Sequence, residues 1–387
     1  MKVAFFSNYL NHHQLPLAQA LYELTNHQYV FVATKEISQA RLDLGYPDMN
    51  NVYPFVLRAY ESEDDYQKAM EIAKTCDVMI SGSAPEEFTF ERLQTGKLTF
   101  RYSERIYREK MSRENIRDRM RAAKCTLVTN YRYPHYMLCS SAYTAADHAT
   151  FGNYIGRTYK WGYFPEVKKY DSPEALMDMK QNEEKVQLLW VGRLLELKRA
   201  ETAIYTAEYL KEMGCSFELN IIGTGDQEEK LSELIETNDL KECVHMLGAF
   251  PPEKVREYME KANIFLFTSN RMEGWGAVLN EAMNSGCAVV ACDAIGSVPY
   301  LIDNGKNGII YHDGNQAQLN RAVLSLVNND EKQKMMGINA YETMLNTWNA
   351  DEAAKRFLKL CEVINSGRHT PYKSGPCSRA HIFSKKR

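Results

Sequence analysis

The second half of the chain alternates short apolar runs with stretches of helical periodicity, and this alternation constrains the fold more than any other feature. Each run is ended by Gly, Ser or Asp, and the runs cover residues 186–192, 217–223, 243–248, 263–269 and 287–292. Strands buried on both faces and joined by crossover helices form parallel sheets. The second half is therefore predicted to be a doubly wound α/β domain.

The first half repeats this pattern. An apolar run beginning at residue 2 leads through a polar loop into a helical pattern, and further strands are predicted at 29–34, 77–82, 98–103 and 136–141. A chain of 387 residues exceeds the usual size of one compact core. We therefore expect two Rossmann-like domains that face each other across a cleft.

The domain boundaries follow from changes in composition. Residues 162–184 are charged and contain two prolines, which is typical of a linker. We predict domains over 1–165 and 185–348, joined by a linker over 166–184. A helix over 349–366 is expected to return to the first domain, followed by a basic, disordered tail over 367–387.

Composition excludes several protein classes. An apolar content of 44% with 25% charged residues is that of a globular protein. No apolar run approaches the roughly 18–20 residues of a membrane-spanning helix, and the first residues do not resemble a signal peptide. Nine cysteines occur without a CxxC pair, which favours reduced thiols in a cytoplasmic protein.

The segment EGWGAVLNEAMNSG, residues 273–286, holds two glutamates that are separated by seven residues. Glu273 is expected in the loop after a strand, and Glu281 in the second turn of a helix that starts near Gly276. The helical part alone then separates the two by about 7 Å along its axis. This separation suits two halves of one ligand, and free N–H groups at the helix start favour a phosphate. The alternative is a helix with two solvated glutamates.

A second segment, WVGRLLELKRA over 190–200, places two cations where a buried strand ends. Arg193 follows the strand directly, and Lys198 lies where a helix is expected to begin. Two cations at this position can offset the charge of a diphosphate leaving group. The alternative is a pair of ordinary surface charges.

Together these segments resemble the retaining glycosyltransferases of family 4, which have the GT-B fold of two Rossmann-like domains. The resemblance also covers IIGTGDQEEKL at 221–231, VHMLGAF at 244–250, the segment 273–311 and TWNADEAAKRFL at 347–358. These pieces span the second half in the family's order. In the first half only the fold pattern and FRYSERIY at 100–107 resemble the family.

The resemblance implies a role for each matched residue. Arg193 and Lys198 would grip the donor diphosphate, Glu273 would contact the transferred sugar, and Glu281 would accept hydrogen bonds from the ribose hydroxyls. The remaining donor-binding candidates are Gly274, Gly276, Ala277 and Val278 at the phosphates, Gly223 and Gly225 in a loop beside the nucleotide, and Met246 and Leu247 at the base. GTGD at 223–226 is not a dinucleotide fingerprint, because Glu228 occupies the third glycine position.

The first domain departs from the family pattern. Its first loop, SNYLNHHQLP, lacks the glycines that many members have there, and we match no histidine to the one that many members place near the sugar. Candidates for acceptor or sugar contacts are Asn8, Asn11, His12, His13, Ser103 and Glu104. The alternatives are a polar surface turn for the first four and a solvated strand edge for the last two.

Neither a metal nor a cofactor is expected. No aspartate pair of the D-x-D type follows a strand, and the acidic loop ESEDD at 61–65 leads into a helix, so its charges suit the helix start. No nucleophile has an adjacent base that would carry a covalent intermediate. The resemblance implies attack from the face that the diphosphate leaves, with a diphosphate oxygen taking the acceptor's proton.

Two basic segments bear on partners. Residues 101–124 hold nine Lys/Arg against four Asp/Glu, and residues 367–387 hold six Lys/Arg and no acid. Either segment suits contact with anionic lipid headgroups at the inner face of the cell membrane. For 101–124 the alternative is an ordinary solvated helix. No nucleic-acid-binding signature is present, so no nucleic-acid partner is expected.

The predicted function is transfer of a sugar from a UDP- or GDP-linked donor to a glycan or lipid-linked acceptor, with retention of configuration. The family suggests the assembly of bacterial cell-surface polysaccharide. Two alternatives stay open. One is a nucleotide-sugar epimerase or a sugar phosphorylase on the same fold, and the other is a non-catalytic GT-B subunit that binds a partner.

Overall fold

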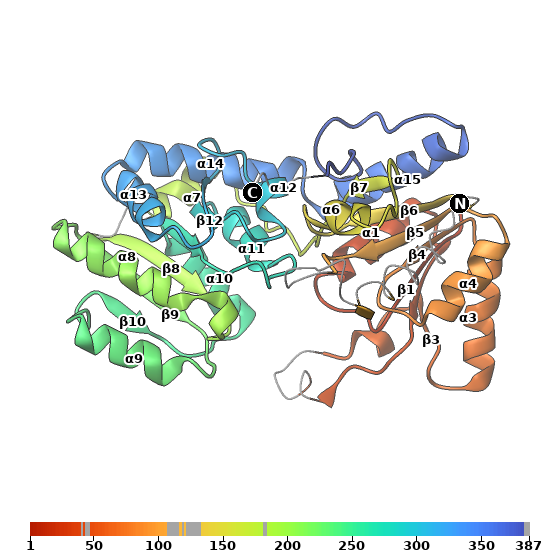
Figure 1. Cartoon of the computed structure of the whole chain (residues 1–387), viewed down its shortest axis with the longest axis horizontal. Coiled ribbons are helices and arrows are strands. Elements are labelled where there is room, and N and C mark those ends of the chain that lie inside the picture. The colour runs from red at the N-terminus through yellow and green to blue at the C-terminus, as the bar shows by residue number, and fades with distance from the viewer. Residues whose placement is uncertain are drawn as a thin grey trace. The chain divides into compact units, whose positions relative to one another are not determined.

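The computed structural model describes residues 1–39, 47–106, 133–180 and 184–382, together with Leu42, Ile116, Arg117 and Met120. The chain divides into two compact units. The first contains Met1–Glu166 and the C-terminal segment from Asn349, and the second contains Val167–Trp348 (Figure 1).

The first unit is built on a parallel sheet of seven strands in the order β3-β2-β1-β4-β5-β6-β7. Its strands are β1 (Val3–Ser7), β2 (Tyr29–Ala33), β3 (Val56–Arg58), β4 (Val78–Ser81), β5 (Thr99–Ser103), β6 (His135–Cys139) and β7 (Thr158–Lys160). Its described helices are α1 (Leu15–Leu24), η1 (Met49–Asn51), α3 (Glu63–Thr75), α4 (Glu86–Gln94), α6 (Thr144–Ala149) and α15 (Ala350–Asn365). The last of these, α15, packs beside α1 although the two are far apart in the sequence.

The second unit has a parallel sheet of six strands in the order β10-β9-β8-β11-β12-β13. The strands are β8 (Val186–Val191), β9 (Phe217–Ile222), β10 (Val244–Met246), β11 (Ile264–Phe267), β12 (Ala288–Cys292) and β13 (Ile309–Tyr311). The helices are α7 (Pro173–Lys180), η2 (Glu196–Lys198), α8 (Ala200–Glu212), α9 (Glu228–Thr237), α10 (Pro252–Lys261), α11 (Val278–Asn284), α12 (Val298–Leu301), α13 (Gln316–Val327) and α14 (Asp330–Asn346).

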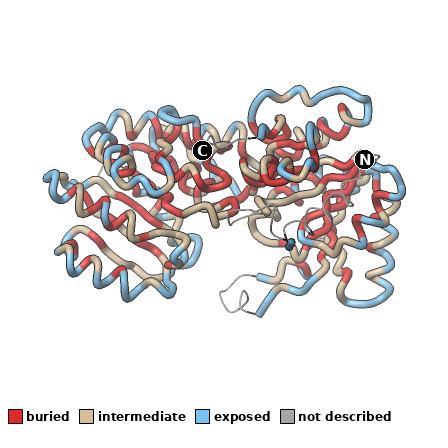
Figure 2. The backbone as a smooth tube through the Cα atoms, viewed as in Figure 1, coloured by how far each residue is buried: buried red, intermediate tan, exposed pale blue. Residues whose placement is uncertain are grey.

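The apolar runs of the sequence form the buried centre of each sheet. All residues of β1, β4, β11 and β12 are buried, because helices cover both faces of a parallel sheet. Figure 2 shows this burial along the strands, with exposed residues on the outer sides of the helices. The three-residue strands β3, β7 and β13 were not predicted. They lie at the sheet edges and are too short to leave a periodic pattern.

The predicted linker over 166–184 is wrong for most of its described length, because it packs into the second unit. Leu176 and Met177 of α7 are buried against Tyr341 of α14. Lys180 is also buried, and its Nζ donates to the carbonyls of Met259 (2.8 Å) and Ala262 (2.7 Å), where α10 ends. These carbonyls satisfy the ammonium group, which explains how a charged stretch folds into the unit.

The predicted disorder of the tail is also wrong for residues 367–382. Residues 377–380 run antiparallel to β7 with backbone hydrogen bonds from Lys160 N to Ser378 O (2.8 Å) and from Ala380 N to Thr158 O (3.1 Å). An edge strand has unpaired N–H and C=O groups, and this segment pairs with them. Residues 383–387 lie outside the described residues.

Candidate functional site

The candidate site in the second unit lies where the strand order reverses. β8 and β11 are neighbours in the sheet, and their connections lead to opposite sides. Ligands of such sheets bind outside the carboxyl ends of the strands at this switch point. Arg193 follows β8 by two residues, and Glu273 lies between β11 and α11, so the fold brings both predicted segments to this place.

Lys198 and Glu273 form an ion pair between the Lys198 Nζ and the Glu273 Oε2. Their side chains are only 17% and 13% exposed. The pair is supported from the end of β11, where the Thr268 hydroxyl donates to the carbonyl of Lys198 (2.8 Å) and accepts from Trp190 Nε1 (2.8 Å). The sequence assigned the two residues to different parts of a ligand, and the structure shows that they also contact each other.

The loop that carries Arg193 is held against the GTGD loop. Gly223 has φ +143°, and a Cβ there would lie 1.8 Å from the carbonyl oxygen of Gly192, so only glycine fits. The backbone N–H of Leu194 donates to Thr224 O (2.9 Å). Arg193 itself is exposed, and its side chain has no polar partner among the residues that the structure describes. This guanidinium is available to an anionic ligand.

The turn before α11 also depends on a close backbone approach. Gly276 has φ +76°, and a Cβ there would lie 2.3 Å from the Phe267 ring. After it, α11 begins at Val278, two residues later than predicted, so Glu281 lies in the first turn of the helix and not in the second. Gly274 and Ala277 are buried beside this turn. Glu273 therefore lies in a loop and Glu281 in a helix, as predicted.

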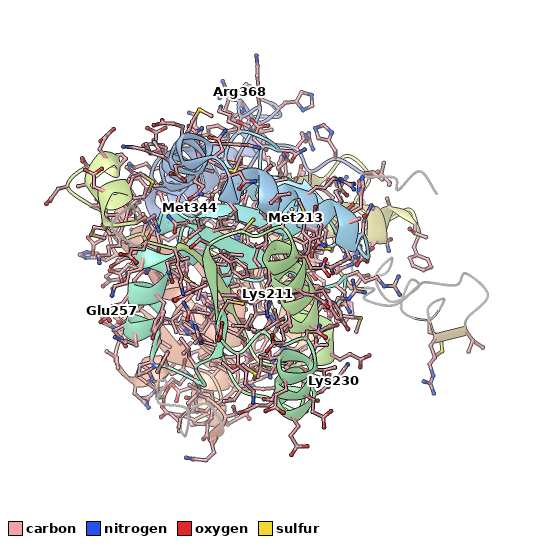
Figure 3. The ribbon with its side chains drawn as sticks, turned by 90° about the vertical axis from the view of Figure 1, so that its left-hand side faces the viewer. Lys211, Met213, Lys230, Glu257, Met344 and Arg368 are labelled. Carbon is pink, nitrogen blue, oxygen red and sulfur yellow. The ribbon has the colours of Figure 1, made fainter. Side chains whose placement is uncertain are left out.

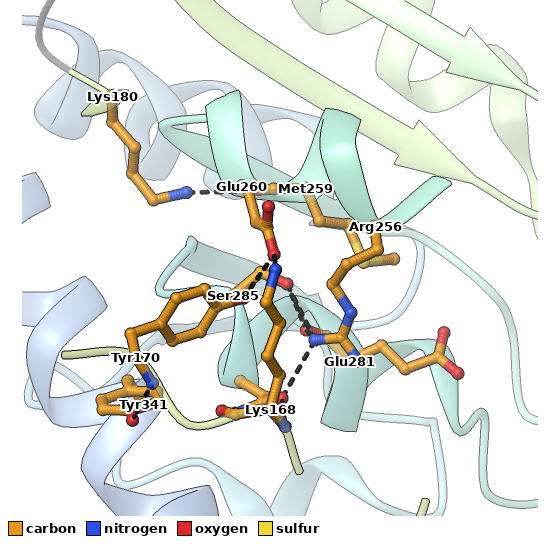
Figure 4. A network of polar contacts seen from close by, with 10 residues as sticks. Lys168, Tyr170, Lys180, Arg256, Met259, Glu260, Glu281, Ser285 and Tyr341 are labelled. Carbon is orange, nitrogen blue, oxygen red and sulfur yellow. Dashed lines mark hydrogen bonds and ion pairs between the residues drawn. The ribbon is translucent and has the colours of Figure 1, made fainter. Parts of the chain in front are cut away.

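Arg256 of α10 fixes the helix that carries Glu281. Its Nη1 donates to the Glu281 carbonyl (3.3 Å), to Asn284 Oδ1 (3.0 Å) and to Ser285 Oγ (3.0 Å). In Figure 4 the Glu281 carboxylate points away from this network. Burial raises the pKa of the Glu281 carboxyl, and the positive charge of Arg256 opposes the shift. Arg256 therefore binds the backbone carbonyl of Glu281 and leaves the carboxylate group out of this network.

The same network extends to the segment before α7. Glu260 Oε1 accepts from Lys168 Nζ (2.6 Å) and from the Tyr170 hydroxyl (2.7 Å), and Asn284 Nδ2 donates to the carbonyl of Lys168 (3.0 Å) (Figure 4). Burial raises the pKa of the Tyr170 hydroxyl. Residues 168–170 are therefore bonded to both α10 and α11.

The two residues predicted to contact a base lie at the end of β10, next to β9. The backbone N–H of Leu247 donates to Ile221 O (2.9 Å), and the Met246 sulfur accepts from the Ser232 hydroxyl (3.5 Å). Gly223 N donates to Gly248 O (2.8 Å), so the GTGD loop and the end of β10 are joined. Both segments follow strands that lie on the side of β8 opposite to β11, which precedes Glu273.

The first unit brings several of its candidate residues together at the carboxyl ends of its strands. The Tyr163 hydroxyl, after β7, donates to Glu104 Oε1 (2.7 Å), after β5. The ring of His13, after β1, is stacked with the Tyr163 ring at 5.9 Å between centroids. Ser103 donates to the carbonyl of Glu104 (2.7 Å). His13, Ser103 and Glu104 are therefore neighbours, and Tyr163 joins them.

The other three candidates of the first loop have local roles. The Asn11 side chain accepts from the backbone N–H groups of His13 (3.1 Å) and Gln14 (3.1 Å) and so stabilises the start of α1. The His12 ring lies 3.8 Å from that of His13. The carbonyl of Asn8 accepts from Thr34 and Lys35. His12 therefore lies next to His13. Asn8 and Asn11 use these hydrogen bonds to hold the backbone of the loop.

Three contributors were not found by sequence reasoning. Thr268, Arg256 and Tyr163 act through contacts with residues far away in the sequence, and each follows or lies within an ordinary-looking element. For Thr268, its hydroxyl directly after the apolar run of β11 was the one feature of the sequence that could have marked it as a site residue. For Arg256 and Tyr163 nothing in their own segments marks them.

The basic segment, the acidic loop and the expectations about metals and membrane spans remain. Most of the basic segment 101–124 lies outside the described residues. ESEDD starts α3, where the Ser62 hydroxyl accepts from Asp65 N. Over the described ranges no cluster of three His, Cys, Asp or Glu suits a metal ion. In the same part of the chain, every helix is too short or too polar to span a bilayer.

Comparison with known proteins finds likenesses to glycosyltransferases over part of the chain. Residues 172–343 match the model of the family "Glycosyl transferases group 1". The amylovoran biosynthesis glycosyltransferase AmsK of Erwinia amylovora is 36% identical over 146 residues, which are 36% of this chain and 36% of AmsK. The putative colanic acid biosynthesis glycosyltransferase WcaL of Salmonella typhimurium is 28% identical over 46% of this chain and 45% of WcaL. The matches thus span about a third to a half of these relatives.

A solved structure supports the fold over nearly the whole chain. HepE of Anabaena, solved in complex with UDP, superposes with a TM-score of 0.69 at 16% identity, covering 95% of this chain and 100% of HepE. The predicted α/β class with two Rossmann-like sheets is confirmed. Residues 172–343 thus match the group 1 glycosyl transferases, and the likeness to HepE shows the fold of two Rossmann-like sheets over nearly the whole chain.

Proposed function

We propose that the protein transfers a sugar from a UDP-linked donor to a hydroxyl group of a glycan or lipid-linked acceptor, with retention of configuration. The observation that carries the proposal is the ion pair of Lys198 and Glu273 at the switch point of the second sheet, with Arg193 exposed in the loop that follows β8. HepE has been solved with UDP and with UDP-glucose, which favours a uridine donor.

In this proposal Arg193 and Lys198 hold the donor diphosphate. Their two positive charges stabilise the negative charge that develops as the bond between the sugar carbon and the diphosphate oxygen breaks. The acceptor oxygen forms the new bond to that carbon, and its proton passes to the departing diphosphate oxygen. The backbone N–H groups of Gly276, Ala277 and Val278 approach the phosphates.

The two glutamates have separate roles. Glu273 contacts the sugar and also orients the ammonium group of Lys198 through their ion pair. Glu281 accepts hydrogen bonds from the ribose, since its carboxylate points away from the Arg256 network. Met246 and Leu247 pack against the base.

The acceptor side of the proposal rests on the first unit. Its strand ends bring His13, Glu104 and Tyr163 together, which gives two rings for stacking on a sugar and a carboxylate that accepts from a hydroxyl. AmsK and WcaL are named for amylovoran and colanic acid biosynthesis, so we assign the acceptor to a cell-surface polysaccharide. A cytoplasmic enzyme at an anionic membrane surface is consistent with this assignment.

Steady-state kinetics of Glu273→Gln and Glu281→Gln tests the division of roles. Glu281→Gln is expected to raise the donor KM, because ribose contacts are equal in the ground and transition states. Glu273→Gln is expected to lower kcat, because the sugar changes charge as the bond breaks. Glu257→Gln is the matched control, since this glutamate is exposed on α10 and pairs only with Lys254 among the described residues.

The outcomes separate the alternatives. Two variants with normal kinetics would contradict both roles, and two pure kcat defects would contradict the division between them. With UDP-glucose as the probe, a transferase releases UDP, an epimerase returns an altered UDP-sugar, and a phosphorylase with added phosphate gives a sugar phosphate. A non-catalytic subunit turns over none of these.

A further inference from the structure

The tryptophan of EGWG joins the loop that carries Glu273 to the helix that carries Glu281. Trp275 is fully buried, and its Nε1 donates to Oδ1 of Asn280 (2.9 Å). Asn280 is also buried, and it directly precedes Glu281 in α11. One buried hydrogen bond between side chains therefore connects the two segments that hold the glutamates.

The backbone between the glutamates needs such a connection. Gly274 and Gly276 flank Trp275, and a glycine has more accessible backbone conformations than any other residue. The backbone alone therefore restrains the path from the loop to α11 only weakly. A buried side chain at the centre of this path, bonded to the helix, supplies the missing restraint.

The indole is itself held by two further rings of the second unit. The Trp275 ring centroid lies 6.3 Å from that of Tyr300 and 6.0 Å from that of Trp348. Tyr300 belongs to α12, and Trp348 lies just beyond α14, the helix on which Figure 3 labels Met344. Aromatic rings at these distances attract one another. The indole that bonds Asn280 is therefore fixed by α12 and by the end of α14.

We propose that Trp275 and Asn280 are positioning residues, and that their hydrogen bond sets the separation of Glu273 and Glu281. This inference rests on the proposed function, in which one donor molecule reaches both glutamates. In that function the ribose of UDP contacts Glu281, and only the sugar of UDP-glucose reaches Glu273. A change in the separation should therefore weaken the binding of UDP-glucose more than the binding of UDP.

The same hydrogen bond stabilises the fold, so the experiment must separate position from stability. Trp275→Phe or Asn280→Leu alone removes one partner and leaves the other buried without this bond, which should lower the melting temperature by roughly 2–10 °C. Replacing both partners with apolar side chains can be nearly neutral. The double variant should therefore recover most of the melting temperature, although the hydrogen bond is absent.

Titration calorimetry with UDP and with UDP-glucose then measures the positioning. We expect the double variant to bind UDP-glucose about tenfold more weakly than the wild type, which is the loss expected for one hydrogen bond to a carboxylate. Its affinity for UDP should be nearly unchanged. A purely structural role of the bond predicts instead that affinity for UDP-glucose recovers together with stability.

Asn307→Ala is the control for a loss of stability alone. Asn307 is buried, and its Nδ2 donates to Leu301 O (3.0 Å) and to Thr343 Oγ1 (2.9 Å). It precedes β13, so it lies at the amino end of the sheet and not at the carboxyl end, where the candidate site is. Its substitution should lower the melting temperature and leave both affinities unchanged.

Two results would overturn this inference. The first is wild-type affinity for UDP-glucose in the double variant, which would make the bond purely structural. The second is an equal loss for UDP and UDP-glucose, which would mean that the bond does not set the separation of the two glutamates. Both results appear only in the variants. A wild type that binds neither ligand would reject the proposed function, and this inference with it.

Discussion

The contact between the Arg193 loop and the GTGD loop gives a quantitative test of how the proposed donor site is built. A Cβ on Gly225 would lie 2.4 Å from the carbonyl oxygen of Leu194, 2.7 Å from its carbon and 2.9 Å from its nitrogen. All three neighbours are backbone atoms, so no side-chain rotation relieves the clash. Gly225→Ala must therefore push the two loops apart.

The size of the effect follows from the bonds that cross this contact. Leu194 N donates to Thr224 O (2.9 Å), and Gln227 N donates to Leu194 O (3.1 Å). Losing two such bonds costs about 2 kcal/mol, and the overpacking itself costs about 1–3 kcal/mol. We expect Gly225→Ala to lower the free energy of unfolding by about 3–5 kcal/mol and, by displacing Arg193, to weaken UDP binding at least tenfold.

Gly214→Ala is the matched control. Gly214 follows α8 with φ +70°, and nothing lies within 4 Å of a Cβ placed there. Its substitution should cost only the strain of a left-handed conformation, about 1 kcal/mol, and should leave UDP affinity unchanged. Urea unfolding and titration calorimetry with UDP measure both quantities. Equal UDP affinities in the two variants would refute the reasoning, because the contact would then have no part in placing Arg193.

Further predictions concern other parts of the molecule. Arg193→Ala and Lys198→Ala should each weaken UDP binding by about 1.5–3 kcal/mol, because each loses a charged hydrogen bond. Uridine binding should stay nearly unchanged. Equal losses for UDP and uridine in calorimetry would mean that these residues support only the fold. Tyr163→Phe removes the hydroxyl that donates to Glu104, so transfer to the acceptor should fall at unaltered UDP affinity, and unchanged transfer would remove Tyr163 from the site. Burial lowers the pKa of His148 to about 4, so the unfolded chain binds a proton that the folded protein does not, and stability should fall as the pH drops from about 6.5 to about 4. The loss is on the order of 3 kcal/mol, and His148→Leu should reduce it in urea unfolding followed against pH; the same pH slope in both proteins would contradict this account.

The sequence by itself determined the architecture and placed the candidate site residues after particular strands. Strands such as 263–269 and 287–292 are apolar throughout because both faces of a parallel sheet are covered, so the pattern is local and readable. Arg193 and Glu273 follow such strands, and the carboxyl ends of neighbouring parallel strands meet at one edge of the sheet. That both follow strands at the same end of the second sheet was therefore implicit in the alternation.

Only the tertiary structure decided which residues contact each other and where the charged segments go. The Lys198–Glu273 pair, the support of α11 by Arg256 and the Tyr163–Glu104 contact each join residues distant in the sequence. Segments 166–184 and 367–387 have the composition of a linker and a disordered tail. Yet Lys180 is satisfied by the carbonyls at the end of α10, and residues 377–380 pair with the open edge of β7. Composition reports which side chains a segment contains. Whether the segment folds depends also on hydrogen-bonding groups elsewhere in the chain with which it can pair.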